Sequence, residues 1–229
     1  MPPVIDDIHN LAASEYCNDV VNKGINAELD VLADIIETSK EIPYVGSLIK
    51  LFNVGASVYS YCHNYKKLAH FLKHALELSI SDRKKFVESW DTNMRKKAAE
   101  YIISVLNSAE DSDKADVLGL VYKARLLGRI NDEMLLRLTS IVNRIYIRDL
   151  RMIDSAPENT QDLDNIISNF SACGIIKDKS GSWQYGKMRR DEQGSLACHF
   201  NSAGKALYDI LKKEEWFANH NMGNRACSG

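Results

Sequence analysis

Apolar residues recur every three or four positions through most of the first 154 residues of the chain. An α-helix has about 3.6 residues per turn, so this spacing places the apolar side chains on one face of a helix. Leu32 and Ile36 lie on one such face, and Gly24 and Gly128 are placed to end two of the helices. The pattern predicts a bundle of about six or seven helices over residues 1–154.

The pattern changes after Asp154. Residues 155–160, SAPENT, have the composition of a loop and predict a linker. A helical pattern over residues 161–173 follows, then two short apolar segments separated by polar turns, then a helical pattern over residues 203–213. We therefore expect a mainly α protein. Its parts are a multi-helix bundle over residues 1–154, a small α+β module over residues 156–217 and a flexible tail over residues 218–229.

The C-terminal segment resembles the end of a winged-helix domain. Residues 174–176 read Gly-Ile-Ile, where many bacterial winged helices close their third helix with Gly-Leu-Ile. Phe200, Asn201, Gly204 and Leu207 match the LTxxGxxL pattern that opens the last helix, with Asn201 in place of the usual Thr. The resemblance implies a winged-helix-like module whose hairpin tip, the wing, contacts phosphates in the DNA-binding relatives.

By this resemblance the wing carries Lys187, Arg189 and Arg190. The helix in the recognition position contains Asp162 and Asp164, which oppose duplex binding because phosphate contacts dominate affinity for DNA. Two interpretations therefore stay open. The module docks on duplex DNA, or it docks on a protein partner.

A second resemblance concerns the N-terminal bundle. The run IPYVGSLIKLFNVG at residues 42–55, followed by the segment at residues 66–90, is similar to uncharacterised bacterial helical proteins. Those proteins are found near mobile elements and phage-defence genes. The resemblance implies a context of phage defence or counter-defence and carries no catalytic motif.

Charge is unevenly distributed, although the net charge is only −2. Residues 1–40 carry eight acidic and two basic side chains, whereas residues 41–110 carry ten basic and seven acidic ones. The small net charge excludes a basic field over the whole chain. The asymmetry indicates that one part meets another part, or a partner, electrostatically.

Four arginines fall on one face of a single long helix predicted over residues 132–154. Their spacings are 7, 4 and 3, and we call Arg137, Arg144, Arg148 and Arg151 the arginine stripe. Guanidinium groups bind phosphates and carboxylates equally well. The stripe therefore predicts contact with an anionic group, in a partner or elsewhere in the chain.

A complementary acidic stripe lies on the predicted second helix. Asp30, Asp34, Glu37 and Glu41 share one face at spacings of 4, 3 and 4. The two stripes pair within one fold or across a dimer, or the arginine stripe binds nucleic acid. We favour the pairing, because the protein as a whole is mildly acidic.

Residues 42–62 form the most apolar stretch and are about as long as a membrane span. Gly46, Lys50, Asn53 and Ser57 nevertheless recur along it every three or four positions and give it a polar stripe. Such a stripe is typical of a buried helix in a bundle, because hydrocarbon does not tolerate it. Insertion of this stretch into a membrane stays the alternative.

His70 and His74 are spaced like the metal ligands of an HExxH helix. No carboxylate lies between them, and Lys66, Lys67 and Lys73 crowd the same side of the helix, so we expect exposed histidines and no metal. Asp111, Asp113 and Asp116 are expected to cap the helix that follows them. We expect no cofactor and no small-molecule substrate.

The five cysteines are widely spaced and form no CxxC pair. This usage indicates free thiols in a reducing compartment. The N-terminus lacks a basic segment followed by an apolar run, so we expect a cytoplasmic protein.

The sequence contains no nucleophile elbow, no phosphate-binding loop and no dinucleotide fingerprint. We therefore expect a non-enzymatic binding or scaffolding protein of bacterial origin. It would assemble through charged helix faces, with itself or a protein partner, and dock on DNA or protein through the C-terminal module. The alternative function is a membrane-acting effector that inserts residues 42–62 on activation.

Overall fold

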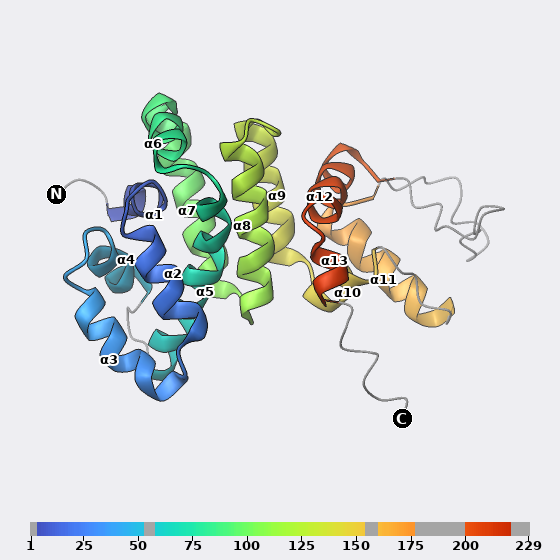
Figure 1. The fold of residues 1–229 in the computed structure, drawn as a ribbon. Coiled ribbons are helices and arrows are strands. Elements are labelled where there is room, and N and C mark those ends of the chain that lie inside the picture. Colours follow the sequence, from blue (N-terminus) through green and yellow to red (C-terminus); the bar gives the residue numbers. More distant parts are fainter. Residues whose placement is uncertain (1–3, 53–57, 154–159, 177–199, 221–229) are drawn as a thin grey trace. The chain divides into compact units, whose positions relative to one another are not determined.

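The computed structural model describes residues 4–52, 58–153, 160–176 and 200–220 (Figure 1). The chain divides into two compact units, Met1–Asn143 and Arg144–Gly229. The expectation of a mainly helical protein is confirmed in the described residues of both units. The predicted linker lies almost wholly within residues 154–159, which are outside the described residues.

The described residues of the first unit form ten helical segments and most of a further one, α9, whose last residue belongs to the second unit. In chain order these are η1 (Val4–Asp6), α1 (Asp7–Ala12), α2 (Cys17–Asn26), α3 (Leu29–Ser39), α4 (Val45–Phe52), α5 (Val58–Lys73), η2 (His74–Glu77), α6 (Ile80–Ser89), α7 (Thr92–Ser108), α8 (Ser112–Leu126) and α9 (Asp132–Arg144). The expectation of six or seven helices was too low, because several apolar patterns are interrupted by turns.

Local sequence explains several of the helix ends. The side chains of Ser79, Asp91 and Asp111 accept hydrogen bonds from backbone N–H groups in the first turns of α6, α7 and α8. These bonds satisfy donors that the start of a helix leaves unpaired. As expected, α8 ends just before Gly128, which has a left-handed φ of 67°.

Two helices form the centre of the first unit. α5 packs against α2, α3 and α8, and Figure 1 shows α5 between α2 and α8. Every residue of α8 from Lys114 to Ala124 is buried. Because α8 is covered on all sides, its polar residues must find partners inside the protein.

Gly24 does not end a helix, contrary to the sequence-based expectation. It lies inside α2, where a Cβ atom would come within 2.4 Å of the Ala69 Cβ on α5. The absence of a side chain lets α2 approach α5 closely.

The second unit contains the short helix α10 (Ile147–Arg151), then α11 (Thr160–Cys173), α12 (Ser202–Lys213) and α13 (Trp216–His220). An isolated antiparallel bridge joins Ile176 to Phe200. It is the only β-type pairing in the described residues. The hairpin expected between these residues lies at 177–199, outside the described residues.

The prediction of one continuous helix over residues 132–154 was wrong. α9 ends at Arg144, and Tyr146 has an extended backbone with φ −77° and ψ 124° before α10 begins. Ile145 and Ile147 are both buried, whereas Tyr146 is 46% exposed. Alternation of this kind suits an extended segment, because residues i and i+2 of a helix point in nearly opposite directions.

We predict that Gly24→Ala lowers the free energy of unfolding by about 2 kcal/mol, because the added Cβ forces α2 away from α5. Alanine is the better helix former, so a helix without this packing constraint would gain stability instead. Thermal and urea denaturation measure the change. Asn22→Ala, at an exposed position of α2, is the matched control and should leave stability nearly unchanged. A Gly24→Ala variant as stable as the wild type would contradict the role given to this contact.

Candidate functional site

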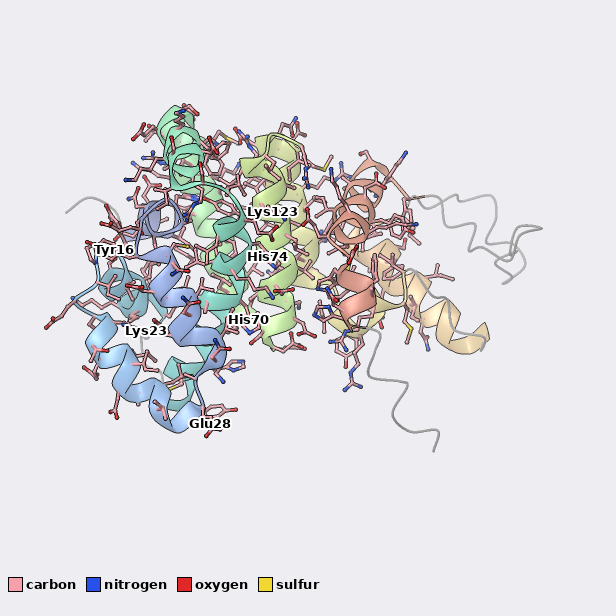
Figure 2. All side chains as sticks on the ribbon, viewed as in Figure 1. Tyr16, Lys23, Glu28, His70, His74 and Lys123 are labelled. Carbon is pink, nitrogen blue, oxygen red and sulfur yellow. The ribbon has the colours of Figure 1, made fainter. Side chains whose placement is uncertain are left out.

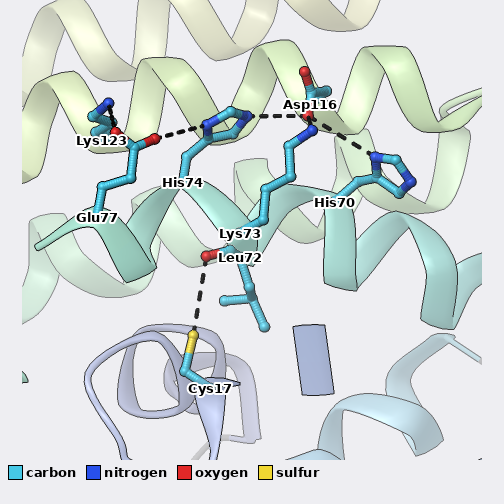
Figure 3. A network of polar contacts seen from close by, with 8 residues as sticks. All are labelled: Cys17, His70, Leu72, Lys73, His74, Glu77, Asp116 and Lys123. Carbon is cyan, nitrogen blue, oxygen red and sulfur yellow. Dashed lines mark hydrogen bonds and ion pairs between the residues drawn. The ribbon is translucent and has the colours of Figure 1, made fainter. Parts of the chain in front are cut away.

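A network of ionisable side chains lies between the end of α5 and α8 (Figure 3). At its centre is Asp116, whose side chain is only 5% exposed. Its Oδ1 atom lies 3.0 Å from His74 Nε2 and 3.9 Å from His70 Nδ1, and it forms an ion pair with Lys73 Nζ. Two side chains from α5 and one from η2 thus converge on one carboxylate from α8.

The network continues through His74 to a second carboxylate. His74 Nδ1 lies 3.4 Å from Glu77 Oε1, and the other oxygen of Glu77 accepts a hydrogen bond of 2.5 Å from Lys123 Nζ on α8. In its doubly protonated form, the His74 ring donates to both carboxylates. Lys73 faces Asp116 and Glu77 faces Lys123, so each buried charge of this contact has a group of opposite charge beside it.

The surroundings of Asp116 decide what this carboxylate can do. Burial acts to raise its pKa, but the interactions with His70 and His74 and the positive charge of Lys73 outweigh burial. Together they hold the pKa of Asp116 well below its usual range. A general base needs a pKa near the working pH. The arrangement therefore suits a permanent structural ion cluster better than proton transfer.

Gly119 makes this close approach feasible. A Cβ atom at this position would lie 2.4 Å from the Phe71 carbonyl oxygen and 3.0 Å from His74 Cδ2. Sequence reasoning expected exposed histidines and a capping role for Asp116. Of the three aspartates, Asp111 caps α8 and Asp116 joins the network. The sequence feature that could have revealed this network is the position of Asp116 among the apolar residues of α8.

A second polar centre surrounds His9 of α1. Its Nε2 lies 3.0 Å from the Arg95 carbonyl oxygen, which can only accept, so Nε2 carries the proton. Its Nδ1 therefore accepts from the Tyr122 hydroxyl, 2.9 Å away. The ring also lies 4.9 Å from the ring of Trp90. Burial lowers the pKa of His9 to about 4 and keeps the ring neutral.

The sequence contains two basic triplets, at residues 83–85 and 95–97, and the first arginine of each has partners within the first unit. Arg83 is buried and donates through Nη1 to the Ala12 carbonyl oxygen, 2.5 Å away. Arg95 forms an ion pair of 2.9 Å with Asp6. The sequence hides these contacts, because their partners lie more than seventy positions away.

The arginine stripe is divided by the break between α9 and α10. Arg137 is exposed on α9 in the first unit, whereas Arg144, Arg148 and Arg151 belong to the second unit. Arg144 Nη2 donates to the Cys173 carbonyl oxygen at 3.2 Å, which joins the end of α9 to the end of α11. The single straight face expected of a continuous helix is therefore absent.

The acidic stripe is shorter than expected. Asp34 and Glu37 are exposed on α3, and Glu37 forms an ion pair of 2.5 Å with Lys40. Glu41 lies beyond the helix, because α3 ends at Ser39. The side chain of Asp30 lies outside the described residues. Pairing between the two stripes stays a prediction.

Asn201 follows the Ile176–Phe200 bridge of the second unit and forms several hydrogen bonds there. The Asn201 side chain accepts from the N–H groups of Ala203 and Gly204 and donates to the Gly174 carbonyl oxygen at 2.7 Å. Its backbone N–H donates to the Ile175 carbonyl oxygen at 3.0 Å. We call these contacts the Asn201 joint. One residue thus both caps α12 and ties it to the end of α11.

The Asn201 joint involves the two segments that carry the winged-helix resemblance. Gly174 has a left-handed φ of 79°, and a Cβ on Gly204 would lie 2.0 Å from the Ile175 carbonyl oxygen. The wing residues Lys187, Arg189 and Arg190 lie outside the described residues.

The apolar stretch at 42–62 is not one helix. It spans α4 and the start of α5, with residues 53–57 between them outside the described residues. No described helix combines the length and the apolar character needed to cross a membrane. Cys17, Cys62 and Cys173 are buried free thiols. Within the described ranges, no group of three or more His, Cys, Asp or Glu side chains is arranged to hold a metal ion.

Comparisons with known proteins assign no relative to this chain. No family model, no curated protein and no solved structure matches it.

We predict that acidification from pH 6.5 to pH 4 destabilises the protein through His9. The unfolded chain binds a proton at this residue near its ordinary pKa of 6.5, whereas the folded protein does so only near pH 4. The free energy of unfolding should therefore fall as the pH is lowered through this window, by about 3 kcal/mol in total from this group.

Chemical denaturation across this pH range measures the effect. His9→Gln should be less stable at pH 7 but should show a flatter decline between pH 6.5 and pH 4. His63→Gln, at a half-buried position of α5, is the matched control and should keep the wild-type slope. Equal slopes for His9→Gln and the wild type would remove His9 as the source.

Proposed function

We propose that the protein is a non-enzymatic binding and scaffolding protein of the bacterial cytoplasm, acting in phage defence or counter-defence. In this proposal the first unit is a rigid scaffold that self-associates through exposed charged helix faces. The second unit is a winged-helix-like module that docks on a protein partner.

The Asn201 joint is the observation that carries the docking module. In the winged-helix resemblance, the third helix and the last helix are held together at the base of the wing. Asn201 makes the corresponding connection between the end of α11 and the start of α12. A fixed base of this kind supports presentation of the predicted wing to a partner.

Charge favours a protein partner over duplex DNA. The described residues of the second unit carry six Lys and Arg side chains and six Asp and Glu side chains. Asn165, Ser168 and Asn169 supply a neutral polar face to α11, where a DNA-reading helix would carry basic residues. Phosphate contacts dominate affinity for duplexes, so this balance disfavours DNA.

The buried networks support the scaffold role of the first unit. The hydrogen bonds of Asp116 and His9 are made to other residues of the first unit. Asp34, in contrast, is exposed on α3 and has no ion-pair partner among the described residues. Exposed charges of this kind are available for contact with another molecule.

We predict that the purified chain shows no saturable binding to labelled mixed-sequence duplex DNA, measured by fluorescence anisotropy at low and at moderate salt. A nearly neutral module offers too few phosphate contacts. If binding is seen, weakens steeply with salt and is lost in the Arg189→Ala/Arg190→Ala double variant, then the module is a DNA-binding winged helix and the protein-docking proposal is overturned.

The proposed self-association through the acidic stripe leads to a separate prediction. Sedimentation velocity should show an oligomer that weakens with added salt, since exposed ion pairs are screened. The Asp34→Lys/Glu37→Lys double variant should sediment as a monomer at concentrations where the wild type is associated. Glu100→Lys/Glu133→Lys makes the same change in net charge at exposed positions of α7 and α9 and should stay associated. A monomeric wild type would overturn this part of the proposal.

A further inference from the structure

The two basic triplets of the first unit use their residues in the same way, and both read Arg-Lys-Lys. Arg83 and Arg95 are held within the first unit, the one by a backbone carbonyl oxygen and the other by a carboxylate. The lysines that follow them form no hydrogen bond or ion pair with a described residue. Three of these lysines are exposed and one is half-buried. We call the four residues the lysine group: Lys84, Lys85, Lys96 and Lys97.

The lysine group keeps its positive charge, because few carboxylates lie beside it in the chain. Only Trp90 and Asp91 separate α6 from α7, so the two pairs of lysines lie on consecutive helices. Glu88 and Asp91 are the acidic residues between the two pairs. Asp91 accepts hydrogen bonds from the N–H groups of Asn93 and Met94 at the start of α7. The segment therefore has four lysines against one carboxylate, Glu88, that is not used in a helix cap.

The acidic stripe lies at the other end of the first unit. Figure 1 shows α6 at the top of this unit and α3 at the bottom. Residues 28–41 contain five acidic residues and one basic residue. Glu28, labelled in Figure 2, precedes α3, is exposed and makes no capping hydrogen bond. Among the described side chains of this segment, only Glu37 and Lys40 form an ion pair, so the α3 end carries an excess of negative charge.

The repulsion between like charges decides which surfaces of two copies can meet. Two acidic stripes repel each other, so the stripe of one copy does not pack against the stripe of another. Self-association through the stripe therefore needs a positive surface on the second copy. Within one copy, no ion pair among the described residues joins the lysine group to the acidic stripe. Both surfaces are thus left for contact with another molecule.

An exposed apolar side chain accompanies each of the two charged surfaces. Val31 is 51% exposed and lies one turn before Asp34 on α3. Ile80 is 41% exposed and lies one turn before Lys84 on α6. Burial of apolar area supplies affinity, whereas complementary charge selects the partner and its orientation. Each surface therefore offers both kinds of contact on which a protein interface depends.

We propose that the lysine group is the docking surface for the acidic stripe of a second copy of this chain. The inference rests on the self-association proposed above and names the surface that receives the stripe. Because α6 and α3 lie at opposite ends of the first unit, a pair of copies keeps one free surface of each kind. Further copies add to these free surfaces, so the assembly grows head to tail beyond a dimer.

Reversal of charge on the two surfaces, separately and together, tests the proposal by sedimentation velocity. The wild type should form species larger than a dimer as its concentration rises. The Lys84→Glu/Lys85→Glu variant should associate about tenfold more weakly, because a negative α6 repels the acidic stripe. The Asp34→Lys/Glu37→Lys variant should be weakened to the same extent. An equimolar mixture of the two variants should recover wild-type association at the same total concentration, since each reversed surface then meets its opposite.

Three controls separate a specific contact from a general effect of charge. Lys205→Glu/Lys213→Glu makes the same change in net charge at exposed positions of α12 and should associate like the wild type. All variants should melt at the wild-type temperature in circular dichroism, because the altered side chains lie on the surface. Nuclease treatment should leave the wild type associated.

The outcomes that would overturn the proposal are distinct. A monomeric wild type overturns the proposed self-association and this inference with it. A wild type that associates, but whose association survives Lys84→Glu/Lys85→Glu, overturns only the assignment of the lysine group as the receiving surface. A mixture of the two variants that stays monomeric, an assembly that stops at a dimer, or one that nuclease dissolves also overturns the head-to-tail contact.

Discussion

The contact of α5 and η2 with α8 is the constraint on which the first unit depends. α8 is buried from Lys114 to Ala124, so each polar group on it needs a partner that another element supplies. Lys73 and His74 neutralise Asp116, and Glu77 neutralises Lys123. All of these partners lie on the last residue of α5 and on η2, which follows it directly. The register between α5 and α8 therefore has little freedom to shift.

The first unit places His9 and His74 in different surroundings. His9 has a carbonyl and a hydroxyl as partners, which satisfy its hydrogen bonds without compensating a charge, so burial keeps it neutral. His74 lies between two carboxylates that accept hydrogen bonds from both of its nitrogens. Burial therefore keeps His9 neutral, whereas His74 connects two carboxylates across the contact between η2 and α8. In both cases, both ring nitrogens have partners within the first unit.

Surface features, by contrast, are left for contact with other molecules. Asp34 and Glu37 are exposed on α3 of the first unit, and the second unit presents a neutral polar face on α11. The Asn201 joint fixes the helices on either side of the predicted wing. The proposed functions of the two units are thus separable, because the acidic stripe and the Asn201 joint share no residue.

The sequence by itself determined what depends on local spacing. The helical content, the cap at Asp111 and the stop at Gly128 follow from interactions within one or two turns, and all three are confirmed. Only the tertiary structure decided the partners of Asp116 and His9, which come from positions 42 and 113 residues away. It also decided the break at Tyr146, which cuts the predicted arginine stripe. A periodic pattern records which face of a helix is apolar. It does not record which other element covers that face, and that choice sets the contacts and the helix ends.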